Sequence, residues 1–196
     1  MANTQRVNGF RPVKHLNGSP YNGQFNIYEI VAGDGTATMV GDLVKADGGT
    51  ATDNFPTCVR HGTTGEITAG AALGVVVGFV PSPTNLDTPQ YRAASTKRYA
   101  MVADSPDLIF EVMDGATVPT TQTLIGMNTG FMATAGSTTT GASGMTTGTT
   151  TATTTITLPL RIVGIVNSPN NTAGAANQRL LVMINQHALG NNTVAV

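Results

Sequence analysis

The chain has 196 residues, of which 11% are charged and 40% are hydrophobic, and its formal net charge is −1. Ordinary domains contain about 25% charged residues, so this chain lacks much of the surface charge that keeps a monomer soluble. Ten lysines and arginines do not supply the basic, aromatic-bearing face of a nucleic-acid-binding protein. The composition favours a surface covered by protein partners; a solvated surface rich in threonine and asparagine is the alternative.

The sequence contains no signal for secretion or membrane insertion. Its first residues lack the apolar core of a signal peptide. The longest apolar run, 69–81, contains three glycines and is shorter than the ~20 residues that span a bilayer. We therefore expect synthesis in a cytoplasm and no membrane association. Cys58 is the only cysteine, which excludes an internal disulfide.

Residues 1–24 are predicted to form an extended N-terminal arm. The segment contains several Asn-Gly turn signals and no apolar periodicity. A disordered tail is the simplest interpretation of such a terminus. Large apolar residues are nevertheless spaced through the segment, and solvated tails seldom contain them. We therefore expect the arm to dock on a neighbouring molecule, with these binding residues: Arg6, Phe10, Arg11, Lys14, Leu16 and Tyr21.

Residues 25–196 are predicted to form a β-rich body. Apolar and polar residues alternate over 25–31, which indicates the first strand. Further strands are expected at 40–45, 57–60 and 71–80. Gly74 and Gly78 within the last of these suggest β-bulges or sharp corners.

The stretch from Tyr99 to Gly115 is predicted to be a central β-hairpin. Two apolar runs, 99–103 and 108–113, flank the sequence Asp-Ser-Pro-Asp at 104–107. Aspartate and serine bond to their own backbone in turns and proline fixes φ, so this centre predicts a tight reversal. Valine, isoleucine, phenylalanine and tyrosine in the flanks are typical of strands.

Residues 133–157 are mostly threonine, glycine, alanine and serine, and we interpret them as an insertion into the body. One interpretation is a flexible, low-complexity loop. The other is an extended β-ribbon, because threonine favours strands and threonine pairs bond across them. Either would project from the body.

The last strands are predicted at 158–166 and 180–185, and they introduce a similarity within the chain. Residues 77–85 and 163–171 share a pattern of apolar strand, glycine and Ser-Pro-containing loop. Shared turn chemistry could produce this match by chance. Alternatively, the chain contains two similar strand–loop–strand units.

Motifs for catalysis or metal binding are absent from the sequence. His15, His61 and His187 lie far apart, and none belongs to a known metal-binding pattern. Cys58 and His61 could form half a metal site, but a core thiol beside an exposed histidine is the simpler interpretation. We expect no enzymatic activity, no catalytic residues, no metal and no cofactor.

Several segments together resemble the capsid decoration, or cement, proteins of tailed bacteriophages. They are NGFRPV (8–13), NGSP (17–20), GDLV (41–44), GVVVG (74–78) and VADSPDLIFEV (102–112). The resemblance implies a virion structural protein on the capsid surface that binds the outside of the major capsid protein lattice and clamps neighbouring subunits. It also implies dimers or trimers on the capsid, and no metal, nucleotide or nucleic acid.

The sequence thus predicts an all-β fold: a single-domain β-barrel or sandwich with an N-terminal arm and a projecting threonine- and glycine-rich segment. The alternative function is a carbohydrate- or receptor-binding β module of a virion or cell surface, with 133–157 as its contact face. Sugar sites usually contain an aromatic platform, and 133–157 contain no aromatic residue. This lack favours the decoration protein.

Overall fold

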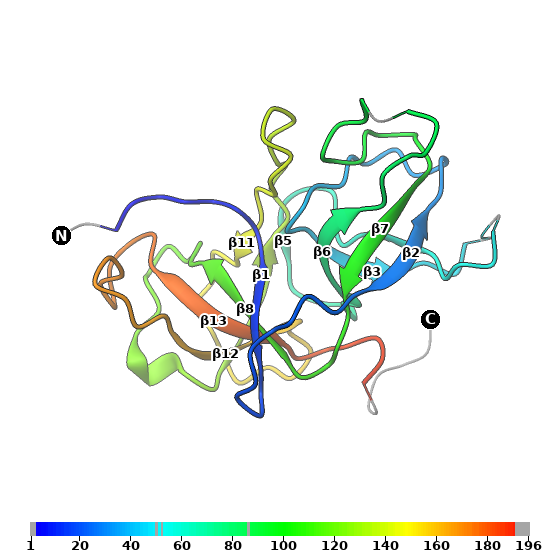
Figure 1. Cartoon of the computed structure of the whole chain (residues 1–196). Coiled ribbons are helices and arrows are strands. Elements are labelled where there is room, and N and C mark those ends of the chain that lie inside the picture. Colours follow the sequence, from blue (N-terminus) through cyan, green and yellow to red (C-terminus); the bar gives the residue numbers. More distant parts are fainter. Residues whose placement is uncertain (1–2, 50, 52, 86, 191–196) are drawn as a thin grey trace.

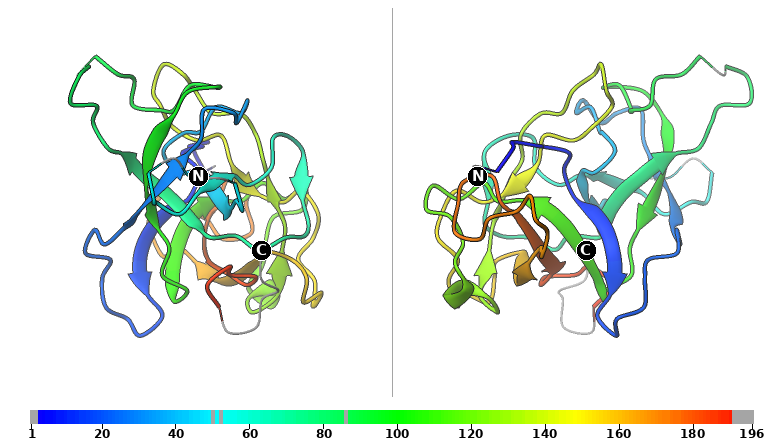
Figure 2. Two further views of the ribbon diagram at one scale, coloured as in Figure 1. Left: turned by 90° about the vertical axis from the view of Figure 1, so that its right-hand side faces the viewer. Right: turned by 60° about the vertical axis from the view of Figure 1, so that its left-hand side comes forward.

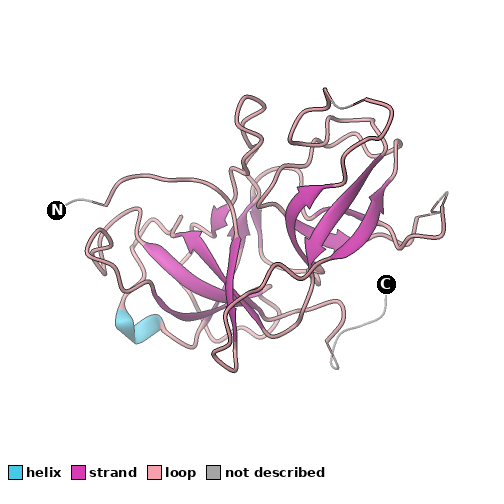
Figure 3. Cartoon of the chain, viewed as in Figure 1, coloured by secondary structure: helices cyan, strands magenta, loops and turns pink. Residues whose placement is uncertain are grey.

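The computed structural model describes residues 3–49, 51, 53–85 and 87–190, and these residues form an all-β fold (Figures 1 and 3). The only helix among them is the short 3-10 turn η1 (Gln122–Leu124). Among the described residues, no helix is long and apolar enough to span a membrane. The strands are β1 (Arg11–His15), β2 (Asn26–Ile30), β3 (Leu43–Ala46), β4 (Cys58–Arg60), β5 (Glu66–Ile67), β6 (Gly74–Phe79), β7 (Arg98–Ala103), β8 (Leu108–Met113), β9 (Asn128–Thr129), β10 (Phe131–Met132), β11 (Thr146–Thr147), β12 (Leu160–Ile165) and β13 (Arg179–Ile184).

Two five-stranded antiparallel sheets make up most of the body. The N-sheet has the order β2-β7-β6-β3-β4, and the C-sheet has the order β1-β8-β13-β12-β9. They lie side by side in Figure 1, with the small sheet β11-β10-β5 completing the fold. A bridge between Glu29 and Thr57 links the two ends of the N-sheet.

The predicted hairpin at 99–115 is wrong, although both of its strands exist. β7 pairs with β2 and β6 in the N-sheet, whereas β8 pairs with β1 and β13 in the C-sheet. The turn at 104–107 therefore passes the chain from one sheet to the other. Asp104 fixes this junction by accepting hydrogen bonds from Asn26 Nδ2 (3.0 Å) and from the Tyr28 hydroxyl (2.6 Å).

The two sheets contain the same four-strand unit twice. β2, β7, β6 and β3 of the N-sheet correspond to β8, β13, β12 and β9 of the C-sheet, in the same spatial order. In both units the register shifts at one residue of the central pair, Val77 in β6 and Val163 in β12. The similarity between 77–85 and 163–171 therefore reflects two similar units, as one of the two interpretations held.

Backbone hydrogen bonds outside the paired strands repeat in the same way. In each unit a glycine N–H donates to the carbonyl of one residue in β6 or β12, and the N–H of that same residue donates back to the residue after the glycine. A third bond follows the end of β6 or β12. These bonds are Gly41 N–H to Val76 O (2.8 Å) and Gly126 N–H to Ile162 O (2.8 Å); Val76 N–H to Asp42 O (3.0 Å) and Ile162 N–H to Met127 O (2.9 Å); and Val80 N–H to Tyr99 O (2.9 Å) and Val166 N–H to Arg179 O (3.0 Å).

The two units share part of their hydrophobic core. One cluster lies within the N-sheet and includes Ile30 and Val102. The larger cluster fills the C-sheet side and also contains Val75 and Ala103 from the N-sheet. Figure 2 shows the sheets packed together from two further directions. The units therefore form one body.

The predicted separation of residues 1–24 from the body is corrected by the structure. β1 is an edge strand of the C-sheet, and its residues Arg11, Pro12, Lys14 and His15 pair with β8. Phe10 is only 1% exposed and packs edge to face on Phe131, with ring centroids 6.3 Å apart. Burial of an aromatic ring and pairing of the adjacent strand hold this segment against the body.

The predicted projection of residues 133–157 holds for only one part of them. Residues 134–142 form the yellow-green loop at the top of Figure 1, whereas 143–148 lie inside the fold. Met145 is fully buried, and β11 pairs with β10. Asp42 holds the segment because its carboxylate accepts hydrogen bonds from Ser143 Oγ (2.6 Å) and Arg60 Nε (2.9 Å).

Candidate functional site

The outer face of the C-sheet gathers basic side chains from three strands, β1, β12 and β13. Neighbouring residues of a strand point to opposite faces, so the ladder pairs show which side chains share a face. Leu108, Phe110 and Val112 of β8 belong to the core, so Ile109 and Glu111 lie on the opposite face, where Glu111 is partly exposed and Ile109 is covered, at 2% exposed. The residues on this outer face, here called the basic face, are Arg11, Lys14, Ile109, Glu111, Met113, Arg161, Arg179, Leu181 and Met183.

The basic face consists of cross-strand rows. One row runs from Lys14 through Ile109 and Met183 to Arg161. At about 4.8 Å per strand, its two charged ends lie about 14 Å apart with apolar side chains between them. The next row contains Arg11, Glu111 and Leu181, and a third contains Met113 and Arg179. Each of the first two rows thus combines basic and apolar side chains.

Positive charge predominates on the basic face. Glu111 is the only acidic residue in the three rows, and its Oε1 lies 3.0 Å from an Arg179 nitrogen. Elsewhere two buried arginines are neutralised within the body, Arg60 by Asp42 and Arg92 by Asp34. Within the described chain, Arg6, Arg11 and Lys14 form no ion pair. Their charge is therefore available to a partner.

The N-terminal unit buries the face that corresponds to the basic face. Its row Ala103–Val75–Leu43 occupies the positions of Met183, Arg161 and Asn128 in the C-terminal unit. All three residues of the N-terminal row are fully buried, in the core that the two units share. In the C-terminal unit the matching row carries an exposed arginine. This face of the sheet is therefore buried in the N-terminal unit, whereas the corresponding face of the C-terminal unit carries a solvent-exposed arginine.

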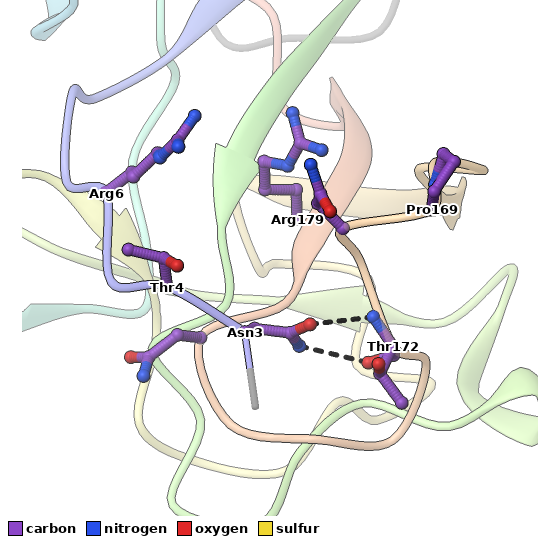
Figure 4. Close-up of a pocket in the computed structure, with 8 residues that line it drawn as sticks. Asn3, Thr4, Arg6, Pro169, Thr172 and Arg179 are labelled. Atoms are coloured by element: carbon purple, nitrogen blue, oxygen red, sulfur yellow. Dashed lines mark hydrogen bonds between the residues drawn. The ribbon is translucent and has the colours of Figure 1, made fainter. Parts of the chain in front are cut away.

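A polar pocket lies at one corner of the basic face (Figure 4). The N-terminal segment contributes Asn3, Thr4 and Arg6, and the region from Pro169 to Arg179 forms the opposite wall. The pocket has a volume of about 230 Å³. Asn3 joins the walls because its Oδ1 accepts the Thr172 N–H (2.7 Å) and its Nδ2 donates to Thr172 O (3.0 Å).

A groove lined by both polar and apolar side chains, here called the mixed groove, lies at the opposite end of β1. Tyr21, Phe25, Pro106 and Leu189 line it, and its volume is about 510 Å³. Phe25 is 45% exposed and Leu189 is 55% exposed. The Tyr21 hydroxyl donates to Gln24 O at 2.8 Å, and burial raises the pKa of Tyr21. The groove therefore adds exposed apolar surface beside the basic face.

The structure separates the six predicted binding residues into three groups. Arg11 and Lys14 lie on the basic face, and Arg6 lies in the pocket at its corner. Tyr21 lines the mixed groove, and Leu16 is 58% exposed near it, with its N–H bound to Asp107 O. Phe10 is buried in the core and is unable to contact a partner.

Arg161 and Arg179 were missed by the sequence interpretation. Both lie in strands that were recognised, but their place beside Lys14 and Arg11 depends on strand order across the sheet. The similarity between 77–85 and 163–171 was the available signal. When this alignment is extended to the residues before 77 and 163, Arg161 aligns with Val75. A charged residue at the position of an apolar one indicates that the C-terminal unit exposes this position.

The Cys58 and His61 pair belongs to the core. Burial raises the pKa of the Cys58 thiol to about 12 and lowers the pKa of His61. The His61 ring packs on Phe131 at 5.1 Å and is 5% exposed, so the expectation of an exposed histidine is wrong. The residues that the structure describes contain no group of three metal-ligating side chains.

Comparison of the chain with protein-family models, with curated proteins and with solved structures finds no match.

Proposed function

We propose that this protein is a virion structural protein that binds the outside of a major capsid protein lattice and stabilises it by clamping neighbouring subunits. The basic face is the observation that carries the proposal, because it gathers unpaired positive charge on a rigid sheet beside the partly exposed side chains of Leu181 and Met183. The resemblance of segments 8–13, 17–20, 41–44, 74–78 and 102–112 to decoration proteins supports the same function.

The apolar parts of this surface are expected to contribute most of the binding energy. An exposed ion pair contributes about 0.2–1 kcal/mol, whereas burial of a large apolar side chain contributes about 1.5–3 kcal/mol. Leu16, Phe25 and Leu189 are exposed and available for such burial. The basic residues then orient the partner and accelerate its association.

A rigid docking surface has a further advantage over a free arm. Ordering a flexible segment costs about 1–2 kcal/mol per residue in backbone entropy. β1 is already paired with β8, so docking through the basic face avoids most of this cost. Dimers or trimers on the capsid would multiply these contacts.

Co-sedimentation with assembled shells tests the proposal. The isolated protein should pellet with expanded capsids and remain in solution with precursor shells. A Lys14→Glu/Arg161→Glu variant reverses both ends of one row and should lower occupancy by about tenfold, with a weaker effect at high salt. Lys45→Glu is the matched control, because Lys45 is exposed on the N-sheet away from the basic face. Equal binding of all three proteins would contradict the proposal.

Carbohydrate binding is the second candidate, and one groove favours it. The loop between β6 and β7 forms a groove of about 460 Å³ whose lining includes Tyr91 and Tyr99. Arg98 braces the groove by donating to Pro89 O (2.6 Å) and Tyr91 O (2.8 Å). Tyrosine rings supply the aromatic platform that 133–157 lack. Saturable glycan binding that is lost in Tyr91→Ala, together with no capsid binding, would favour this candidate.

A further inference from the structure

The polar pocket between residues 3–6 and 169–179 has the composition of an anion site. Two arginines, three asparagines and two threonines line it, and no acidic side chain does. In Figure 4 the guanidinium groups of Arg6 and Arg179 lie on the same side of the pocket. They come from opposite ends of the chain, so this concentration of donors depends on the fold.

The charges around the pocket are incompletely neutralised. One Arg179 nitrogen is bound to Glu111 at 3.0 Å, and the guanidinium forms no further hydrogen bond within the described chain. Arg6 has no hydrogen-bond or ion-pair partner among the described residues and is exposed. Arg11, which pairs in register with Glu111, adds a third positive charge nearby. Glu111 therefore stands beside Arg179 and Arg11, and its single charge leaves the arginines at this corner incompletely neutralised.

We propose that this pocket binds a carboxylate, and that an acidic side chain of the capsid protein supplies it. The source of the carboxylate rests on the proposed function; the binding chemistry rests on the pocket alone. A guanidinium presents paired N–H donors that match the two oxygens of a carboxylate. A pocket of about 230 Å³ accommodates a side chain of this size and excludes a bulky ligand.

Asn3 acts as the positioning residue of the pocket. Besides its two bonds to Thr172, its Nδ2 donates to Ala176 O at 3.1 Å. These three bonds attach the N-terminal segment to the wall that carries Arg179. Arg6 follows Asn3 by three residues, so the same bonds restrict its position beside the pocket. The arginines are therefore held in place before the ligand arrives, which lowers the entropic cost of binding.

Titration of the full-length protein with glutarate, followed by NMR, tests the chemistry without a capsid. The side-chain Nε–H signals of Arg6 and Arg179 should shift and saturate. Arg6→Gln should weaken binding by about tenfold, the loss expected from one charged hydrogen bond. Arg6 is exposed and forms no ion pair with the described residues, so this variant should fold normally. Asn3→Ala should weaken binding while leaving the arginine charges unchanged, and Lys45→Gln should bind as the wild type does.

The remaining outcomes separate the pocket from the proposed function. Shifts that do not saturate, or that are equal in wild type and Arg6→Gln, would overturn the pocket. Binding of inorganic phosphate but not glutarate would overturn the carboxylate assignment. Glutarate binding without co-sedimentation would retain the site and reject the capsid as its partner. If the pocket binds glutarate and the protein binds capsids, Arg6→Gln should also lower capsid occupancy. Unchanged occupancy would contradict the proposal that an acidic side chain of the capsid protein occupies the pocket.

Discussion

Gly41 and Gly126 occupy the same position in the two units of the chain. Each lies two residues before a strand and has a left-handed backbone, with φ of 92° and 88°. Each donates its N–H to the central strand of its own unit at 2.8 Å. Their surroundings differ, however, because Gly41 contacts the N-terminal segment. A Cβ at Gly41 would lie 2.5 Å from Asn8 O, whereas a Cβ at Gly126 would meet no heavy atom within 4 Å beyond its adjacent residues.

Alanine substitutions at these glycines should therefore have unequal effects. Gly126→Ala should lose about 1–2 kcal/mol of unfolding free energy, the cost of a left-handed non-glycine residue. Gly41→Ala should lose more, because the same strain is joined by a backbone clash. Urea denaturation of both variants measures the difference. Equal losses would show that the N-terminal segment is not packed on Gly41.

Phe10 and Phe25 provide a matched pair for the packing of the first 25 residues. Phe10→Ala should destabilise the fold by about 3–5 kcal/mol, because it empties a buried site beside Phe131. Phe25→Ala should change stability by about 0.5 kcal/mol or less, since the ring is 45% exposed. Thermal and urea unfolding measure both values. A mild effect of Phe10→Ala would restore the detached arm expected from the sequence.

The buried pair of Asp42 and Arg60 should be essential for the loop at 134–142. Arg60 also donates to Thr134 O at 2.6 Å, so Asp42→Ala leaves a buried charge unpaired and loosens the loop. The expected loss of stability is about 3–5 kcal/mol. Limited proteolysis should cleave the variant within 134–142 before the wild type. Asp87→Ala, at an exposed position, is the control and should behave as the wild type does.

Sequence periodicity located most strands but not their partners. The apolar runs at 99–103 and 108–113 match β7 and β8, because a side chain's face is set by alternation along a single strand. The turn at 104–107 was also recognised. Strand partners depend on contacts between distant residues, and the residues of a turn contain no information about which sheet receives the next strand.

The basic face could be predicted only in part for the same reason. Arg11 and Lys14 were selected because they stand among apolar residues in a segment without acids. Arg161 joins them through three strand pairings, each separated by many residues in sequence. Phe10 was assigned to a partner because the sequence near a terminus does not distinguish an aromatic residue buried in its own core from one buried by a neighbouring molecule.

Stability should decrease as the pH falls from 7 to 5. Burial lowers the pKa of His61 and of His187 below the usual 6.5, so both stay neutral in the folded chain where the unfolded chain takes up protons. The stability they contribute is complete above pH 6.5 and is lost progressively as the pH falls toward their folded values. His61→Phe should flatten the dependence of the urea midpoint on pH. A urea midpoint that rises as the pH falls from 7 to 5 would contradict the assignment.

The pairing of β1 with β8 has a consequence during synthesis. Arg11 pairs with Glu111, so the first strand leaves the ribosome about 100 residues before its partner. At roughly 5–20 residues per second, this delay lasts about 5–20 s. The N-sheet, whose strands end at Ala103, can form within that interval, and β1 lacks its strand partner until β8 emerges. Adding the first strand should therefore be a late event in folding, and a strand from another nascent copy could take its place on β8.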